Sequence, residues 1–153
     1  MRLDLKGPLL LVGSGNMGLA LLAGWIERGL PATQVVVQDP SPPPAAREYL
    51  AKHGITAHAS VEKLPAPPSV IVMAVKPQIM EQVLPACARH VGPDTVVLSI
   101  AAGRTIASFE KALPPGTAVV RAMPNTPASV GRGITVATPN ARVTAAQRTA
   151  CDT

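Results

Sequence analysis

Aromatic residues are nearly absent from this sequence: tryptophan, tyrosine and phenylalanine occur once each among 153 residues. Proteins that bind single-stranded nucleic acid stack the bases on aromatic side chains, and this chain offers no such platform. The net charge is +5, but the positive residues are scattered along the chain rather than gathered in a run. Such a charge suits a small anionic ligand equally well. We therefore expect no nucleic-acid partner.

Cysteine is also scarce, since the chain contains only Cys87 and Cys151. Two cysteines are too few for a disulfide framework, and neither stands at metal-ligand spacing from the three histidines. We expect reduced thiols in a cytoplasmic protein and no metal site. Long apolar runs are missing as well. None approaches the ~20 residues that span a bilayer, and the N-terminus has no signal-peptide core, so we expect no membrane partner.

What the sequence does contain is a series of short apolar segments that alternate with helical patterns. The segments that read as strands lie at 9–12, 34–38, 55–57, 70–75, 96–100 and 134–137, and a further strand begins at 119–120. Helical spacing or helix start signals follow them near residues 17, 42, 77 and 106. Continuous apolar strands joined by helices are typical of a parallel sheet covered on both faces. The sequence therefore predicts an α/β fold with a doubly wound, mostly parallel sheet.

The end of the chain carries a helix start signal. Thr144 and Gln147 match a capping box, in which each side chain bonds the backbone N–H of the other residue. The helix that follows ends with the chain at Thr153, and an isolated helix this short is marginal. We therefore expect residues 1–140 to form one domain and residues 141–153 to begin a helix that leads into further sequence.

A glycine pattern follows the first predicted strand. Gly13, Gly15 and Gly18 form G-x-G-x-x-G between an apolar strand and a helical stretch, the context in which this pattern predicts dinucleotide binding. The first glycine permits a tight turn, the second lets a pyrophosphate approach the backbone, and the third lets the helix pack close to the strand. The helix N-terminus offers free N–H groups to the phosphates. These features predict a Rossmann-type cofactor site, and a strand–turn–helix without a ligand is the alternative.

Asp39 stands where the adenosine ribose of a dinucleotide is expected. It follows the second predicted strand and lies 39 − 18 = 21 residues after Gly18, close to the ~20 residues typical of a ribose-binding acid. A carboxylate there accepts a hydrogen bond from a 2′-hydroxyl and repels a 2′-phosphate, which favours NADH. Ser41 is close enough to bind a 2′-phosphate instead, and Asp39 also suits a plain turn before Pro40. The choice between NADH and NADPH stays open at this point.

Three further stretches carry a resemblance to a known family. They are Ala74-Val75-Lys76-Pro77, Ser99-Ile100-Ala101-Ala102-Gly103 and Arg121-Ala122-Met123-Pro124-Asn125-Thr126-Pro127. Together with Gly15-Asn16-Met17-Gly18, their order and spacing resemble the N-terminal domain of pyrroline-5-carboxylate reductase over essentially the whole chain. Members of that family make L-proline, the last step of proline biosynthesis, by reducing the C=N bond of Δ1-pyrroline-5-carboxylate with NADH or NADPH.

The resemblance also implies which residues meet each part of the cofactor and the substrate. The pyrophosphate would lie at Ser14, Gly15, Asn16, Met17 and Gly18, and the adenosine ribose or its 2′-phosphate near Ser41. The nicotinamide half would be bordered by Ala74, Val75, Lys76, Pro77, Ala101, Ala102 and Gly103. The residues that would face the substrate crevice are Asn125 and Thr126.

The sequence names no clear proton donor for such a reduction. Lys76 can face the cofactor or be a solvated lysine, and Arg121 suits a substrate carboxylate or a structural ion pair equally well. Members of the family continue with a helical C-terminal domain that forms the dimer and holds the substrate, and its hallmark segments are absent here. The resemblance therefore implies the cofactor-binding domain of a homo-oligomeric enzyme, inactive by itself.

Two other interpretations remain. A β-hydroxyacid dehydrogenase would share the early glycine motif, but the segments 99–103 and 121–127 argue against it. A nucleotide-binding module without catalysis is the second, because such a module needs no further domain.

Overall fold

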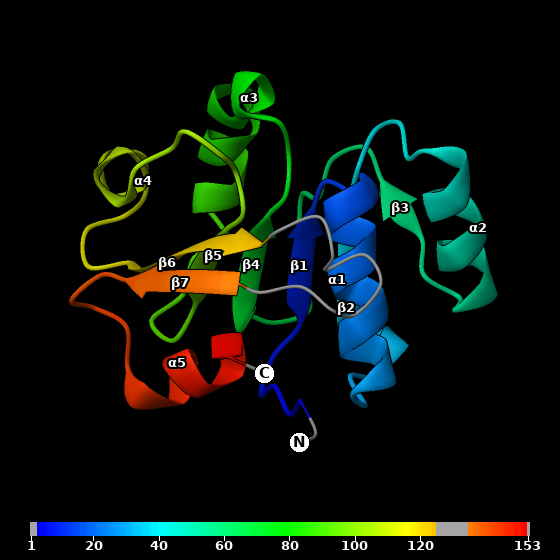
Figure 1. The fold of residues 1–153 in the computed structure, drawn as a ribbon, viewed down its shortest axis with the longest axis horizontal. Coiled ribbons are helices and arrows are strands. Elements are labelled where there is room, and N and C mark those ends of the chain that lie inside the picture. The colour runs from blue at the N-terminus through cyan, green and yellow to red at the C-terminus, as the bar shows by residue number, and fades with distance from the viewer. Residues whose placement is uncertain (1–2, 125–134, 153) are drawn as a thin grey trace.

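The computed structural model describes residues 3–124 and 135–152, and a seven-stranded sheet forms its centre (Figure 1). The strands are β1 (Leu9–Val12), β2 (Val35–Gln38), β3 (Ala57–His58), β4 (Val70–Met73), β5 (Val96–Ser99), β6 (Ala118–Pro124) and β7 (Thr135–Pro139). Their order in the sheet is β3-β2-β1-β4-β5-β6-β7. All neighbours pair in parallel except β7, which runs antiparallel to β6. The predicted doubly wound, mostly parallel sheet is confirmed.

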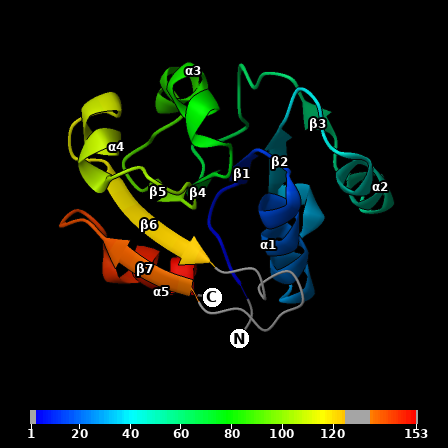
Figure 2. The same ribbon diagram turned by 45° about the horizontal axis from the view of Figure 1, so that its top comes forward.

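Helices cover both faces of this sheet (Figure 2). They are α1 (Asn16–Glu27), α2 (Pro44–Lys52), α3 (Pro77–Ala88), α4 (Ile106–Ala112) and α5 (Ala145–Asp152), with a short 3-10 turn at Ala32–Gln34. Alternate residues of β1 point to opposite faces, as the pleat of a strand requires. Leu9 and Leu11 pack in one core with α1, α2 and α5, whereas Leu10 and Val12 pack in the other with α3 and α4. The two central strands, β1 and β4, are therefore apolar along their whole length.

Only β1 has the predicted bounds, and two of the differences at the other strands have a clear cause or bear on the site. The third was expected at 55–57, but β3 begins only at Ala57 because Ile55 closes the C-terminus of α2. The N–H of Ile55 donates to the Leu50 carbonyl at 2.9 Å, and its side chain is buried in the core. The fourth was expected to reach Val75, but β4 ends at Met73. The two residues after it turn across the carboxyl edge of the sheet, which matters for the site below.

The C-terminal helix starts as the sequence predicts. The N–H of Thr144 donates to Oε1 of Gln147 at 2.8 Å, and the N–H of Gln147 donates to Oγ1 of Thr144 at 3.2 Å, which is a complete capping box. Nε2 of Gln147 also donates to the Asp94 carbonyl at 3.0 Å and fixes α5 to the loop before β5. Across residues 3–124 and 135–152, no helix has the length and apolar character needed to span a membrane.

Both cysteines are free thiols in the structure. Cys87 is a buried residue of α3, and Cys151 is half-buried on α5. Burial raises the pKa of each thiol to about 11. Neither side chain is therefore a thiolate at neutral pH, which fits a packing role.

Candidate dinucleotide-binding site

The carboxyl ends of the parallel strands form one edge of the sheet. The pairing register sets Val12 opposite Gln38 and Met73, and sets Met73 opposite Ser99. The residue that follows each of these strand ends therefore lies in one row along the edge. Strand order reverses between β1 and β4, and ligands of open α/β sheets bind at this edge next to such a reversal. Three of the four predicted cofactor segments start in this row.

The glycine loop occupies the turn from β1 into α1. Gly13 has φ +95°, a conformation that side chains rarely adopt, and a Cβ there would lie 2.8 Å from the Ala74 carbonyl oxygen. A Cβ on Gly18 would lie 2.5 Å from the Gly13 carbonyl oxygen. By contrast, a Cβ on Gly15 would have nothing within 4 Å. The first and third glycines therefore serve close packing, and the second leaves open space above the backbone.

The N-terminus of α1 opens toward that space. The cap residue is Gly15, so no side chain bonds the first N–H groups, and the first turn contains no acidic residue. The first four N–H groups of a helix have no partner within the helix, and their partial positive charge favours an anion. A pyrophosphate fits here because an uncapped helix start and an open backbone face coincide. In this loop, Asn16 is exposed and Met17 is half-buried.

Asp39 binds the glycine loop from the end of β2. Its Oδ2 accepts hydrogen bonds from the N–H of Ser14 at 2.9 Å and from the Ser14 hydroxyl at 2.7 Å. Its Oδ1 accepts from the N–H of Ser41 at 2.9 Å. Burial alone would raise the pKa of Asp39, but these hydrogen bonds outweigh it and hold the pKa below the usual 3.8. The carboxylate is therefore ionised at neutral pH and joins two loops.

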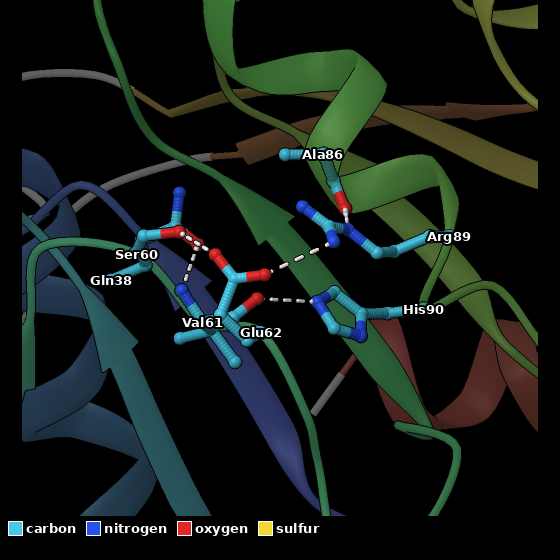
Figure 3. Close-up of polar contacts among 7 residues, drawn as sticks. All are labelled: Gln38, Ser60, Val61, Glu62, Ala86, Arg89 and His90. Atoms are coloured by element: carbon cyan, nitrogen blue, oxygen red, sulfur yellow. Dashed lines mark hydrogen bonds and ion pairs between the residues drawn. The ribbon is translucent and has the colours of Figure 1, made fainter.

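A polar network holds the end of β2 in place (Figure 3). Oε1 of the buried Gln38 accepts from the N–H of Val61 at 3.1 Å. The Val61 carbonyl in turn accepts from Nε2 of His90, at the end of α3, at 2.9 Å. An exposed ion pair between Arg89 and Glu62, at 3.2 Å, lies beside it. The strand end that carries Asp39 is thus connected to the opposite side of the β1–β4 reversal.

The segments after β4 and β5 form the other side of the edge. Ala74 and Val75 are half-buried against the glycine loop, while Lys76 and Pro77 are exposed at the start of α3. Ala101 is buried, and its N–H donates to the Ser99 hydroxyl at 3.2 Å. The two residues after it, Ala102 and Gly103, are exposed. This side offers mainly backbone and small side chains to a ligand.

The two predicted substrate-side residues, Asn125 and Thr126, fall outside the described residues. Arg121, on β6, is half-buried, and in the part of the chain that the structure describes its Nε has no hydrogen-bond partner. No ion pair to Arg121 is present among these residues either. Within residues 3–124 and 135–152, the structural ion pair that the sequence allowed for this arginine is therefore not seen.

Sequence reasoning missed the connection between Ser14 and Asp39. It placed Ser14 at the pyrophosphate, whereas the side chain is fully buried and its hydroxyl donates to Asp39. It also passed over Gln38, whose amide holds the loop before β4. A signal for Gln38 was present, since a polar residue that closes an apolar strand must find a partner when it is buried. No comparable signal in the sequence pairs Ser14 with Asp39.

Comparisons with known proteins show which family the chain belongs to. A family model described as "NADP oxidoreductase coenzyme F420-dependent" matches residues 9–103. Pyrroline-5-carboxylate reductase of Escherichia coli is 43% identical over 135 residues, which cover 87% of this chain and 49% of the relative. A structure of the reductase from Coxiella burnetii has a TM-score of 0.85 at 28% identity and covers 95% of this chain and 54% of that one.

A third similar protein is Plasmodium falciparum pyrroline carboxylate reductase. Its crystal structure, with NADP bound, has a TM-score of 0.78 at 25% identity. It covers 97% of this chain and 53% of that chain. The chain thus spans about half the length of the relatives that it matches. It belongs to the family described as NADP oxidoreductase, coenzyme F420-dependent, and its resemblance to pyrroline-5-carboxylate reductase is confirmed.

Proposed function

We propose that this chain binds NADH or NADPH as the cofactor-binding half of a pyrroline-5-carboxylate reductase. The complete enzyme reduces the C=N bond of Δ1-pyrroline-5-carboxylate to give L-proline. The observation that carries the proposal is the 43% identity with the E. coli reductase over 87% of this chain. The open face above Gly15 and the uncapped start of α1 support the cofactor part independently.

The chain's own residues bind and orient the cofactor in this proposal. The N–H groups at the start of α1 hold the pyrophosphate, and Asp39 lies at the adenosine ribose. The segments 74–77 and 101–103 border the nicotinamide, and Asn125 and Thr126 face the substrate. A bound NADH or NADPH supplies the hydride for the imine carbon. We assign no catalytic residue among residues 3–124 and 135–152.

We further propose that groups outside these 153 residues complete the reaction. The chain spans about half of its relatives, and its carboxyl edge is open on the side of β4 and β5. Residues 1–140 would form the cofactor domain, and residues 141–153 would start the helix that leads to a dimerisation domain. The enzyme would act as a homo-oligomer in the cytoplasm, and the 153-residue chain would be inactive alone.

Calorimetric titration of the chain with NADH and with NADPH tests the cofactor part. We expect at least one of them to bind in the micromolar to millimolar range. Gly15→Ala should weaken that binding at least ~tenfold, which corresponds to about 1.4 kcal/mol, because the added methyl fills the open face. Gly24→Ala, on the same helix, is the matched control, since a Cβ there meets only the flexible end of Arg28. Absence of binding to both dinucleotides would refute the proposal.

A chimaera tests the reaction. Residues 1–153 of this chain are joined to the remaining half of the E. coli reductase, and reduction of pyrroline-5-carboxylate is followed by oxidation of the dinucleotide. We expect turnover by the chimaera, none by the 153-residue chain, and none by the chimaera that carries Gly15→Val. A folded chimaera that binds dinucleotide without turnover would favour a non-catalytic module. The β-hydroxyacid dehydrogenase alternative is not favoured by the relatives.

A further inference from the structure

The Asp39 carboxylate has little capacity left for a ligand. A carboxylate offers roughly four acceptor positions, and three are occupied by the N–H and hydroxyl of Ser14 and by the N–H of Ser41. The residue is partly exposed, so what remains is an acceptor that faces solvent. A hydroxyl group can donate to such an acceptor, whereas a phosphate has no proton to donate at neutral pH and is repelled.

The turn after Asp39 is poor in hydrogen-bond donors. Pro40, Pro42, Pro43 and Pro44 have no N–H, and the N–H of Ser41 is already donated to Asp39. From residue 40 to residue 44, no backbone N–H is therefore available for a 2′-phosphate. The Ser41 hydroxyl is the single side-chain donor in that stretch. A dianionic phosphate normally needs several donors or a cation.

A cation is also missing from this turn. Residues 39–46 contain no lysine or arginine. The first cation after them is Arg47, which lines a shallow hollow with Leu50, Gly54 and Thr56 on the β3 side of α2. Among the described residues, Arg47 forms no ion pair with the Asp39 carboxylate.

The position of Asp39 is fixed from the backbone as well as from the side chain. Its N–H donates to the His58 carbonyl of β3 at 2.8 Å, and the preceding Gln38 carbonyl accepts from the N–H of Gly13 at 2.9 Å. Moving the carboxylate away from a ligand would break hydrogen bonds to both Ser14 and Ser41. A 2′-phosphate therefore meets a fixed negative charge rather than one that can swing aside.

From this geometry we propose that Asp39 makes the adenosine-ribose end of the site selective for the 2′-hydroxyl of NADH over the 2′-phosphate of NADPH. The inference rests on the proposed function, because it needs a dinucleotide in the glycine loop. This preference for NADH would distinguish the chain from the P. falciparum relative, which is 25% identical and whose crystal structure has NADP bound. Asp39 acts here as a specificity-determining residue that Ser14 and Ser41 hold in place.

Titration of the 153-residue chain with NADH and with NADPH at low ionic strength tests this inference directly. We expect NADH to bind at least about tenfold more tightly, because two like charges a few ångströms apart repel strongly near a protein surface. The difference should shrink as salt is added, since salt screens an exposed charge pair. This ratio is measured on the unaltered chain and does not depend on the folding of any variant.

Three variants test whether Asp39 is the source of the NADH preference. Asp39→Asn keeps the size of the side chain and removes the charge, and should bring the two affinities to within about threefold. Asp94→Asn is the matched control, since it removes an exposed carboxylate before β5, at the amino edge of the sheet, and should leave the ratio unchanged. Ser41→Ala should also leave the NADH preference intact.

The outcomes separate the two proposals. If neither dinucleotide binds, the proposed function fails and the inference fails with it. If both bind equally, or NADPH binds more tightly, the proposed function stands and the inference is overturned. A loss of NADPH binding alone in Ser41→Ala would likewise overturn it, because the hydroxyl would then be a 2′-phosphate ligand. A preference for NADH that persists in Asp39→Asn would move the selectivity to another residue.

Discussion

The two sides of the carboxyl edge are held in very different ways. On the β1–β2 side, Ser14 donates twice to Asp39, and Asp39 donates through its N–H to His58. On the β4–β5 side, Lys76 is exposed and has no polar side-chain contact within the described part of the chain. The ion pair between Arg104 and Glu81 on that side is 3.4 Å long, and its side chains are 18% and 80% exposed, respectively. Solvent around Glu81 weakens such a pair.

This difference indicates which part of the proposed site the chain can form without a further domain. On the adenosine side, the hydrogen bonds of Asp39 join the glycine loop, the turn after β2 and β3, and their partners are Ser14, Ser41 and His58. The nicotinamide side presents small, exposed residues such as Ala102 and Gly103. An open side of this kind suits a surface that a further domain covers, as we propose. Four substitutions test the contrast, two on each side.

Gly13→Ala should reduce the stability most, because it changes a residue on the closely packed β1–β2 side. The methyl group would combine a φ of +95° with a contact of 2.8 Å to the Ala74 carbonyl oxygen. Backbone strain and overpacking each cost about 1–3 kcal/mol, so we expect the free energy of unfolding to fall by about 3 kcal/mol. Urea denaturation followed by circular dichroism measures it. A loss below about 1 kcal/mol would mean that the loop adapts.

Asp39→Asn should have the second-largest effect. The donors of Ser14 and Ser41 now use both carboxylate oxygens, whereas an asparagine offers only one acceptor oxygen. We therefore expect the free energy of unfolding to fall by about 1.5 kcal/mol at pH 7. This value is the lower end for hydrogen bonds to a charged group, because Asp39 is partly exposed. The folded pKa lies below 3.8, so this stabilisation is complete above that pH and is lost as the pH falls through the folded pKa. Denaturation at pH 7 and at pH 3 compares the two proteins. If the two proteins differ in stability as much at pH 3 as at pH 7, the charge of Asp39 is not the source of the difference.

The sequence predicted the sheet and the glycine loop, but not the hydrogen bonds that distinguish the two sides of the carboxyl edge. Apolar segments identified β1 and β5 closely, because strands buried on both faces must be apolar throughout. The glycine spacing identified the loop, and residue count placed Asp39 beside it. Strand β3 was misplaced because Ile55 is apolar for a different reason, the closure of α2. The direction of the Asp39 carboxylate was not predictable, since it depends on a hydrogen bond to a serine 25 residues earlier.

Gly103→Ala is the counterpart of Gly13→Ala on the open side. Gly103 also has a positive φ, +74°, but a Cβ there would have nothing within 4 Å. Only the backbone conformation opposes the methyl group, so we expect a loss of about 1 kcal/mol. The same urea titration gives the value. A cost equal to that of Gly13→Ala would show that the turn after β5 is as tightly packed as the glycine loop, and the contrast between the two sides would fail.

Lys76→Ala should have the smallest effect on stability. The side chain is exposed and does not cap α3, so the free energy of unfolding should change by less than about 0.5 kcal/mol. Dinucleotide affinity of the 153-residue chain should also change by less than about twofold, because one exposed charge is screened by salt and solvent. Calorimetry under the conditions used for Asp39→Asn measures both proteins alike. A tenfold loss would mean that Lys76 already binds the cofactor in this chain. The nicotinamide side would then be organised without any further domain, although no polar contact holds its lysine in the structure.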